Sequence, residues 1–128
     1  MLSRQERIKY NGLFLQAYEK GQVLYSKNFV ITYTSTREDH RESLPLTGFV
    51  VSKKFSKKAV IRNKYKRAMR EIYRLFRLPE GNAESLKQVG LLVIALKNKT
   101  SVGDFRNSIF NQYQSELENL LSKMIAAN

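Results

Sequence analysis

The sequence predicts an α+β sandwich, in which helices cover a small sheet. Two amphipathic patterns with apolar residues three and four positions apart indicate helices over residues 56–77 and 100–126. Segments rich in β-branched and aromatic residues, within residues 23–36 and 46–52, indicate strands. The order helix, strands, helix, strand, helix is typical of this class. A length of 128 residues fits one domain, so we expect a single core.

The first expected helix covers residues 11–20 and leads into an extended segment. Asn11 is a favourable N-cap residue, and Gly21 is favourable just beyond a helix C-terminus. Residues 23–36 then read as extended, because "FVITYTST" within them alternates with a period of two. This alternation predicts a strand that buries one face and leaves the other more polar.

The more apolar face of that strand carries Phe29, Ile31 and Tyr33, which we assign to packing. The charged segment "REDHRES" at residues 37–43 predicts a surface loop. A second strand, over residues 46–52, follows this loop and precedes the helix of residues 56–77.

The second half of the chain is expected to end with a buried strand and a long helix. Pro79, Gly81 and Asn82 predict the end of the preceding helix and the start of a loop. The continuous apolar run "VGLLVIAL" at residues 89–96 is typical of a strand buried on both faces. The last helix, from residue 100 to 126, starts with a possible capping box of Ser101 and Asp104. Its apolar face is expected to contain Phe105, Ile109, Tyr113, Leu117, Leu120 and Met124.

The charge of the chain favours a polyanionic partner. Lys and Arg number 23 against 11 acidic residues, which gives a formal net charge of +12. A field of this size attracts nucleic acid first and an anionic membrane surface second. The sequence contains no cysteine, which excludes disulfides and thiolate metal sites and fits a reducing cytoplasm. No signal-peptide h-region and no apolar run near ~20 residues is found, so we expect a cytoplasmic protein without a membrane span.

The helix of residues 56–77 concentrates this positive charge on one side. On a helical wheel, one arc of apolar side chains faces the expected core, and the rest of the surface is basic. Arg62, Lys66 and Arg70 stack like charges at i,i+4 spacing, which costs a few tenths of a kcal/mol per pair. A bound polyanion would offset this repulsion, whereas a merely solvated face usually mixes charges of both signs. Arg and Asn together suit phosphate and RNA contacts, so we favour RNA over a membrane surface.

The basic helix and the strand before it contain two distinctive segments, "AVIRNKYKRAMRE" at residues 59–71 and "GFVVSKK" at residues 48–54. The first resembles the basic signature helix of the protein subunit of bacterial ribonuclease P, and the second matches the strand before that helix in the family. "RIKYNGLFLQAYEKG" resembles the first helix of the family. Three features depart from the pattern: Lys64 replaces an Arg, the connection at Ser56 is one residue longer, and Leu46 and Thr47 stand where a basic residue is usual.

The resemblance implies a fold and a function. The fold would be a four-stranded sheet with three helices in the order α-β-β-β-α-β-α, with a left-handed β-α-β crossover, forming one RNA-binding domain of residues 1–128. The function would be to bind the ribonuclease P RNA subunit and the 5′ leader of precursor tRNA, and so to assist endonucleolytic removal of the leader. The RNA subunit would carry the catalytic centre and its magnesium ions. We expect no cofactor on the protein, no obligate protein partner and no membrane.

The resemblance also implies which residues bind. Phe14 and Tyr18 would bind the leader, because they share one helix face and could stack on bases; Thr32 occupies a strand position where relatives can carry an aromatic. Core packing of these two aromatics is the alternative. The residues implied in binding the catalytic RNA are Lys53, Lys54, Arg62, Asn63, Lys64, Lys66, Arg67 and Arg70.

No residue pattern predicts a catalytic site on the protein. His40, the only histidine, lies between charged residues of a polar loop that also carries Glu38, Asp39 and Glu42. Glu71 reads as a salt-bridge partner, and Asp104 as a helix cap. Without catalytic residues, two other functions stay open: a stand-alone RNA-binding or ribosomal-type protein, and a membrane-surface protein.

Overall fold

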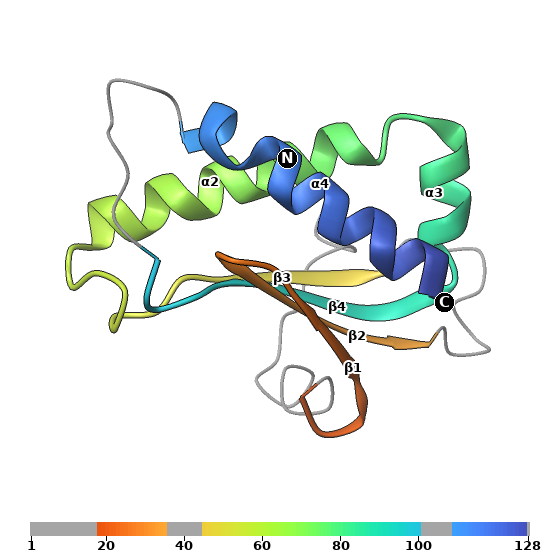
Figure 1. Ribbon diagram of the computed structural model, residues 1–128, viewed down its shortest axis with the longest axis horizontal. Helices are drawn as coiled ribbons and strands as arrows, with labels where there is room; N and C mark the ends of the chain where they lie inside the picture. The colour runs from red at the N-terminus through yellow and green to blue at the C-terminus, as the bar shows by residue number, and fades with distance from the viewer. Residues whose placement is uncertain (1–17, 36–44, 101–108, 128) are drawn as a thin grey trace.

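The computed structural model describes residues 18–35, 45–100 and 109–127, and it confirms the predicted α+β class (Figure 1). Two long helices, α2 and α4, lie on one face of a four-stranded sheet, and the short helix α3 lies at one end (Figure 1). The strands are β1 (Gln22–Tyr25), β2 (Phe29–Ser35), β3 (Leu46–Val50) and β4 (Val89–Leu96). The helices are α2 (Ala59–Phe76), α3 (Glu80–Leu86) and α4 (Ile109–Ala127), and residues 18–20 are also helical.

The sheet is mixed, with the strand order β1-β2-β4-β3. β2 pairs antiparallel with both β1 and β4, whereas β3 pairs parallel with β4. The connection from β3 to β4 runs through α2 and α3, as a parallel pair requires. The four strands and this crossover agree with the fold that the resemblance implied, and the left hand of the crossover stays a prediction.

The extended segment of residues 23–36 contains two strands and not one. The Ser26 backbone N–H donates to the Phe29 carbonyl at 2.9 Å and closes a turn, so that β1 and β2 form a hairpin. Val23, Leu24 and Tyr25 of β1 also favour an extended chain, and the turn contains neither Gly nor Pro, which is why the sequence alone suggested one uninterrupted extended segment.

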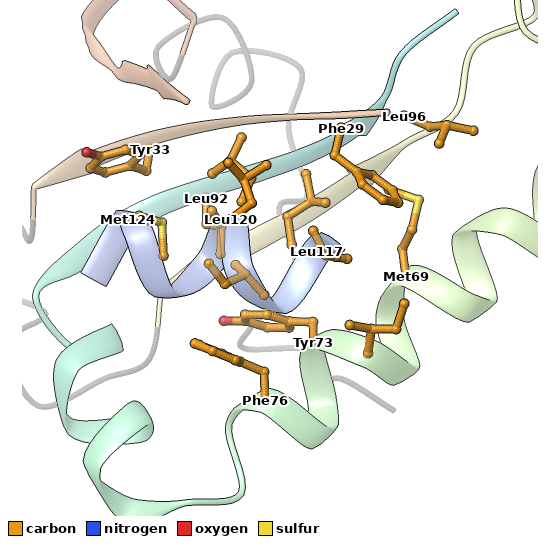
Figure 2. Packing of buried hydrophobic residues seen from close by; sticks show 14 of the residues in the cluster. Phe29, Tyr33, Met69, Tyr73, Phe76, Leu92, Leu96, Leu117, Leu120 and Met124 are labelled. Carbon is orange, nitrogen blue, oxygen red and sulfur yellow. The ribbon is translucent and has the colours of Figure 1, made fainter. Parts of the chain in front are cut away.

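The core lies between the sheet and the two long helices. Phe29, Ile31 and Tyr33 of β2 are buried there, which confirms their assignment to packing (Figure 2). Met69 of α2 and Leu117 of α4 meet them from the helix layer (Figure 2). Full burial of each such side chain stabilises the fold by about 1.5–3 kcal/mol, which explains why the apolar stripes decide how the helices dock.

The expected loop after α2 contains the helix α3. The Asn82 side-chain amide donates to the Phe76 carbonyl at 2.9 Å, and this bond satisfies one acceptor at the end of α2. Leu86, at the end of α3, is fully buried and anchors the helix to the core. The turn formers Pro79 and Gly81 therefore start a new short helix, because burial of Leu86 compensates for their weak helix propensity.

The helix α2 begins later than the sequence suggested. α2 starts at Ala59, and the side chain of its N-cap residue, Lys58, makes no capping hydrogen bond. Ser56, which the pattern placed at the helix start, lies in the preceding turn, and its Oγ accepts the Lys58 N–H at 3.3 Å. The start of α4 at Ile109 borders residues 101–108, so the capping box and Phe105 lie outside the described residues.

Candidate nucleic-acid interface

The helix α2 separates a buried face from a basic face, as the wheel predicted. Tyr65, Met69 and Ile72 are buried on the core side. Asn63 and Arg67 are exposed on the other side. This division explains the sequence pattern, because a helix with one face on a sheet can use its remaining surface for charge. The candidate residues Lys53, Lys54, Asn63, Lys64, Arg67 and Arg70 are exposed, whereas Arg62 and Lys66 are partly buried.

Tyr73 belongs to the buried face, although the wheel did not place it there. Its side chain has 0% exposure, and the Thr47 hydroxyl donates to its phenolic oxygen at 3.3 Å. The Phe49 ring meets it edge-on, with centroids 5.9 Å apart. Thr47 and Phe49 both come from β3, so the docking of this strand beside α2 widens the apolar face. This contact could not be read from the helix alone.

The positive charge of α2 is partly neutralised towards its C-terminus. Glu71 and Arg74 form a salt bridge at 2.6 Å, and the hydrogen bond from Arg74 lowers the pKa of Glu71. This confirms Glu71 as a salt-bridge partner. The Arg77 guanidinium lies over the Tyr73 ring at 5.2 Å. These contacts engage two of the basic side chains near the helix end with groups of the protein itself.

The N-terminal half of α2 contains basic residues but no acidic residue. Its first turn contains no acidic residue, although the positive end of the helix dipole favours acids there. Within the described ranges, neither Lys66 nor Arg67 forms an ion pair with an acidic side chain. The basic residues at this end of α2 adjoin the exposed lysines that precede the helix, and together they form one basic surface.

The connection of residues 52–58 leads from the sheet into α2 (Figure 1). It contains four exposed lysines. The Ser52 carbonyl accepts the Phe55 N–H at 3.1 Å, and the buried Phe55 ring meets Tyr65 with centroids 4.8 Å apart. This anchor turns the chain so that the lysines lie on the solvent side. The four side chains are Lys53, Lys54, Lys57 and Lys58.

Two candidate side chains on this surface are oriented by contacts within the protein. The Arg70 guanidinium lies 5.9 Å from the centre of the Phe49 ring, which holds it over the edge of the sheet. Arg62 Nη1 donates to the carbonyls of Ser56 and Lys57, both at 2.9 Å. Arg70 remains exposed, but Arg62 is partly buried and uses one nitrogen entirely for the backbone.

The structure describes two of the three candidate leader-binding residues, Tyr18 and Thr32. Thr32 points to the sheet face opposite α2 and α4, because the neighbouring Ile31 and Tyr33 point to the core. It is only 3% exposed. Tyr18 is 51% exposed, and partial burial raises the pKa of its phenol. Phe14 lies outside the described residues.

The same sheet face presents an exposed aromatic that the sequence reading missed. Tyr25 is 70% exposed, and its pairing with Val30 places it on the side of Thr32. The Lys97 ammonium lies 5.3 Å from the centre of its ring. A ring with a free face beside a cation is suited to stack a base and contact a phosphate. Only the strand register brings these two residues together.

The described residues contain no cluster of three His, Cys, Asp or Glu side chains that could hold a metal ion. The polar loop with Glu38, Asp39, His40 and Glu42 lies outside them, as does Asp104. No helix in the part of the chain that is described combines the length and apolarity needed to cross a membrane.

The fold and this surface define an α+β protein whose sheet supports a one-sided basic helix. Residues 2–125 match the family model described as Ribonuclease P, so the chain belongs to the ribonuclease P protein family. The ribonuclease P protein component of Petrotoga mobilis is 28% identical over 123 residues, covering 96% of this chain and 94% of that protein. The component of Syntrophus aciditrophicus is 34% identical over 100 residues, covering 78% and 75%.

Solved structures agree with this assignment. The ribonuclease P protein from Thermotoga maritima has a TM-score of 0.69 at 28% identity, with 92% of this chain and 96% of that chain covered. The Staphylococcus aureus ribonuclease P protein has the same TM-score at 24% identity, with 93% and 94% covered. At 24% identity, the similarity to the Staphylococcus aureus structure shows a shared fold only.

Proposed function

We propose that this chain is the protein subunit of a ribonuclease P and assists the endonucleolytic removal of the 5′ leader from precursor tRNA. The observation that carries the proposal is the basic surface formed by the N-terminal half of α2 and the preceding connection. Membership of the family supports the choice of a structured RNA as its partner. The lack of cysteine in the whole sequence fits a reducing cytoplasm.

The basic surface is proposed to bind the catalytic RNA. Arg67 and Lys66 would contact phosphates from α2, and Lys53 and Lys54 would extend the contacts along the connection. Each phosphate that a cation neutralises releases counterions, which makes the affinity fall as salt rises. Asn63, exposed among these cations, can donate to or accept from sugar and base edges. Lys64 and Arg70 would lie at the borders of the same contact.

The opposite sheet face is proposed to bind the leader. Tyr18 and Tyr25 each leave half or more of the side chain exposed, and Lys97 adds a cation beside Tyr25. Stacking of a base on such a ring contributes about 1–3 kcal/mol. Phe14 would add a second ring on the helix of Tyr18, and the buried Thr32 would form the floor between the strands.

The protein is proposed to hold the reacting molecules, with the chemistry supplied elsewhere. Magnesium ions bound by the RNA subunit would activate water and stabilise the leaving oxygen. The basic surface would lower repulsion between the two RNA molecules, and the sheet face would position the leader near the cleavage site.

Reconstitution with the RNA subunit from the same source tests the proposal. Precursor tRNA cleavage is measured at low magnesium for the protein alone, the RNA alone and the mixture. We expect the mixture to cleave faster than the RNA and the protein alone to be inactive. A mixture that cleaves no faster than the RNA would overturn the proposal.

A stand-alone RNA-binding function is the alternative that the basic surface also supports. It would need α2 and the lysines, but not an exposed aromatic on the sheet face. Comparing precursor with mature tRNA binding by the reconstituted complex separates the two functions, because only a leader-binding protein favours the precursor.

A further inference from the structure

We propose that Arg62 is a positioning residue, which fixes the connection before α2 so that Lys57 and Lys58 meet RNA phosphates together. The inference rests on the proposed binding of a structured RNA. It changes the role expected for Arg62, from a direct phosphate contact to a support for the residues that make the contact.

The hydrogen bonds of Arg62 carry the inference. Its Nη1 atom donates to the Ser56 carbonyl and to the Lys57 carbonyl, both at 2.9 Å. A terminal guanidinium nitrogen has two hydrogens, so these two bonds use both of them. The side chain therefore reaches back from the first turn of α2 and spans two successive peptide units of the connection.

The connection has few other restraints at this point. Phe55 is buried against Tyr65, but the chain after it is exposed at Lys57 and Lys58. The other side-chain bond here is the weaker one from the Lys58 N–H to Ser56 Oγ, at 3.3 Å. Without Arg62, two adjacent lysines at the positive end of a helix would repel each other and the helix dipole. Opening of the turn would then be opposed mainly by backbone bonds, in which the Lys58 carbonyl accepts the N–H groups of Ile61 and Arg62 at 3.1 and 3.2 Å.

Lysine is not expected to replace arginine in this role. The guanidinium is planar and rigid, with its donors in fixed directions, whereas an ammonium on a flexible stem does not hold two carbonyls in one geometry. A direct phosphate contact has a different requirement, because it depends mainly on charge, which lysine keeps. Arg62→Lys therefore distinguishes the two roles.

The first experiment measures binding to the catalytic RNA at several salt concentrations. A direct phosphate contact contributes about one unit to the slope of log affinity against log salt. We expect Arg62→Ala and Arg62→Lys each to reduce the magnitude of this slope by about two units, because each change loses the phosphate contacts of Lys57 and Lys58. In a protein that already carries Lys57→Ala and Lys58→Ala, adding Arg62→Ala should change the slope by less than Arg62→Ala does in the unsubstituted protein. The reason is that the lysines positioned by Arg62 are already gone.

The second experiment needs no RNA, so it can fail independently of the proposed function. Backbone NMR order parameters of Lys57 and Lys58 are measured in the free protein. We expect values typical of rigid backbone, near 0.85, to fall below about 0.6 in both Arg62 variants. Circular dichroism checks that α2 remains folded.

The results separate the possibilities. Unchanged order parameters, or a slope that falls by one unit in Arg62→Ala and not at all in Arg62→Lys, would overturn the positioning role. A third result is possible: the Arg62 variants lose backbone order, but even the unsubstituted protein does not bind the RNA. This result would support the positioning role of Arg62 and refute the proposed function.

Discussion

The Glu116 carboxylate joins α4 to the β1–β2 turn by accepting two hydrogen bonds from Asn28, one from the backbone N–H and one from the side-chain amide, each 2.7 Å long. The Ser26 hydroxyl donates to the same carboxylate. Residues about 90 positions apart in the chain are thereby connected, and the edge of the sheet that carries Tyr25 is held against the helix layer.

Glu116→Gln should destabilise the protein. Glutamine keeps only one acceptor oxygen, so its amide nitrogen would replace one of the two oxygens that accept from Asn28 and Ser26, and a partly buried donor would lose its acceptor. We expect the free energy of unfolding to fall by about 1–3 kcal/mol, measured by urea denaturation. Glu84→Gln is the matched control, since Glu84 forms only an exposed ion pair with Lys87 and should change stability by less than about 0.5 kcal/mol. Equal effects of the two changes would contradict this role of Glu116.

Stability should decrease at alkaline pH because of Tyr113. Burial is the main cause that raises the pKa of its phenol to about 12, from an ordinary value of 10.0. The folded state therefore keeps a proton that the unfolded state loses between pH 10 and 12, so the free energy of unfolding falls through this range. Urea denaturation at pH 9 and pH 11 measures the decrease. Tyr113→Phe should show a smaller decrease, and an identical one would refute the assignment.

Arg67→Ala should weaken binding of the catalytic RNA. The exposed guanidinium forms no ion pair with the described acidic residues, so its loss removes a phosphate contact without freeing an acid. We expect the magnitude of the slope of log affinity against log salt concentration to decrease by about one unit, measured by binding titrations at several salt concentrations. Lys123→Ala removes the same charge from the exposed surface of α4 and should leave the slope unchanged. A slope that Arg67→Ala does not alter would place Arg67 outside the interface.

Tyr25→Ala should weaken binding of precursor tRNA by the reconstituted complex and leave mature tRNA binding unchanged. The ring is 70% exposed, so its removal costs the fold little, whereas the lost stacking is worth about 1–3 kcal/mol per base. Dissociation constants for the two tRNA forms give the comparison. Leu78→Ala, which removes another exposed apolar side chain, serves as the control. If Tyr25→Ala weakened both tRNA forms equally, Tyr25 would not contact the leader.

The local patterns of the sequence were sufficient for most elements of the fold. The buried stripe of α2, the apolar strand β4 and the core residues Phe29, Ile31 and Tyr33 follow from periodicity, because a side chain's face is set by its position along a helix or strand. The segments "AVIRNKYKRAMRE", "GFVVSKK" and "RIKYNGLFLQAYEKG" indicated the family. The turn that divides β1 from β2 contains neither Gly nor Pro, and Pro79 and Gly81 indicated a loop where α3 forms, so both features escaped prediction.

The sequence by itself determined the class, the family resemblance and the side of α2 that carries charge. Only the tertiary structure decided that Tyr25 meets Lys97, since β2 must pair with both β1 and β4 to set their register. The tertiary structure likewise shows that Arg62 donates hydrogen bonds to the carbonyls of Ser56 and Lys57, although the charge of Arg62 alone suggested a phosphate contact. Periodicity reports which face a residue occupies, but the partner on that face depends on how distant segments fold together.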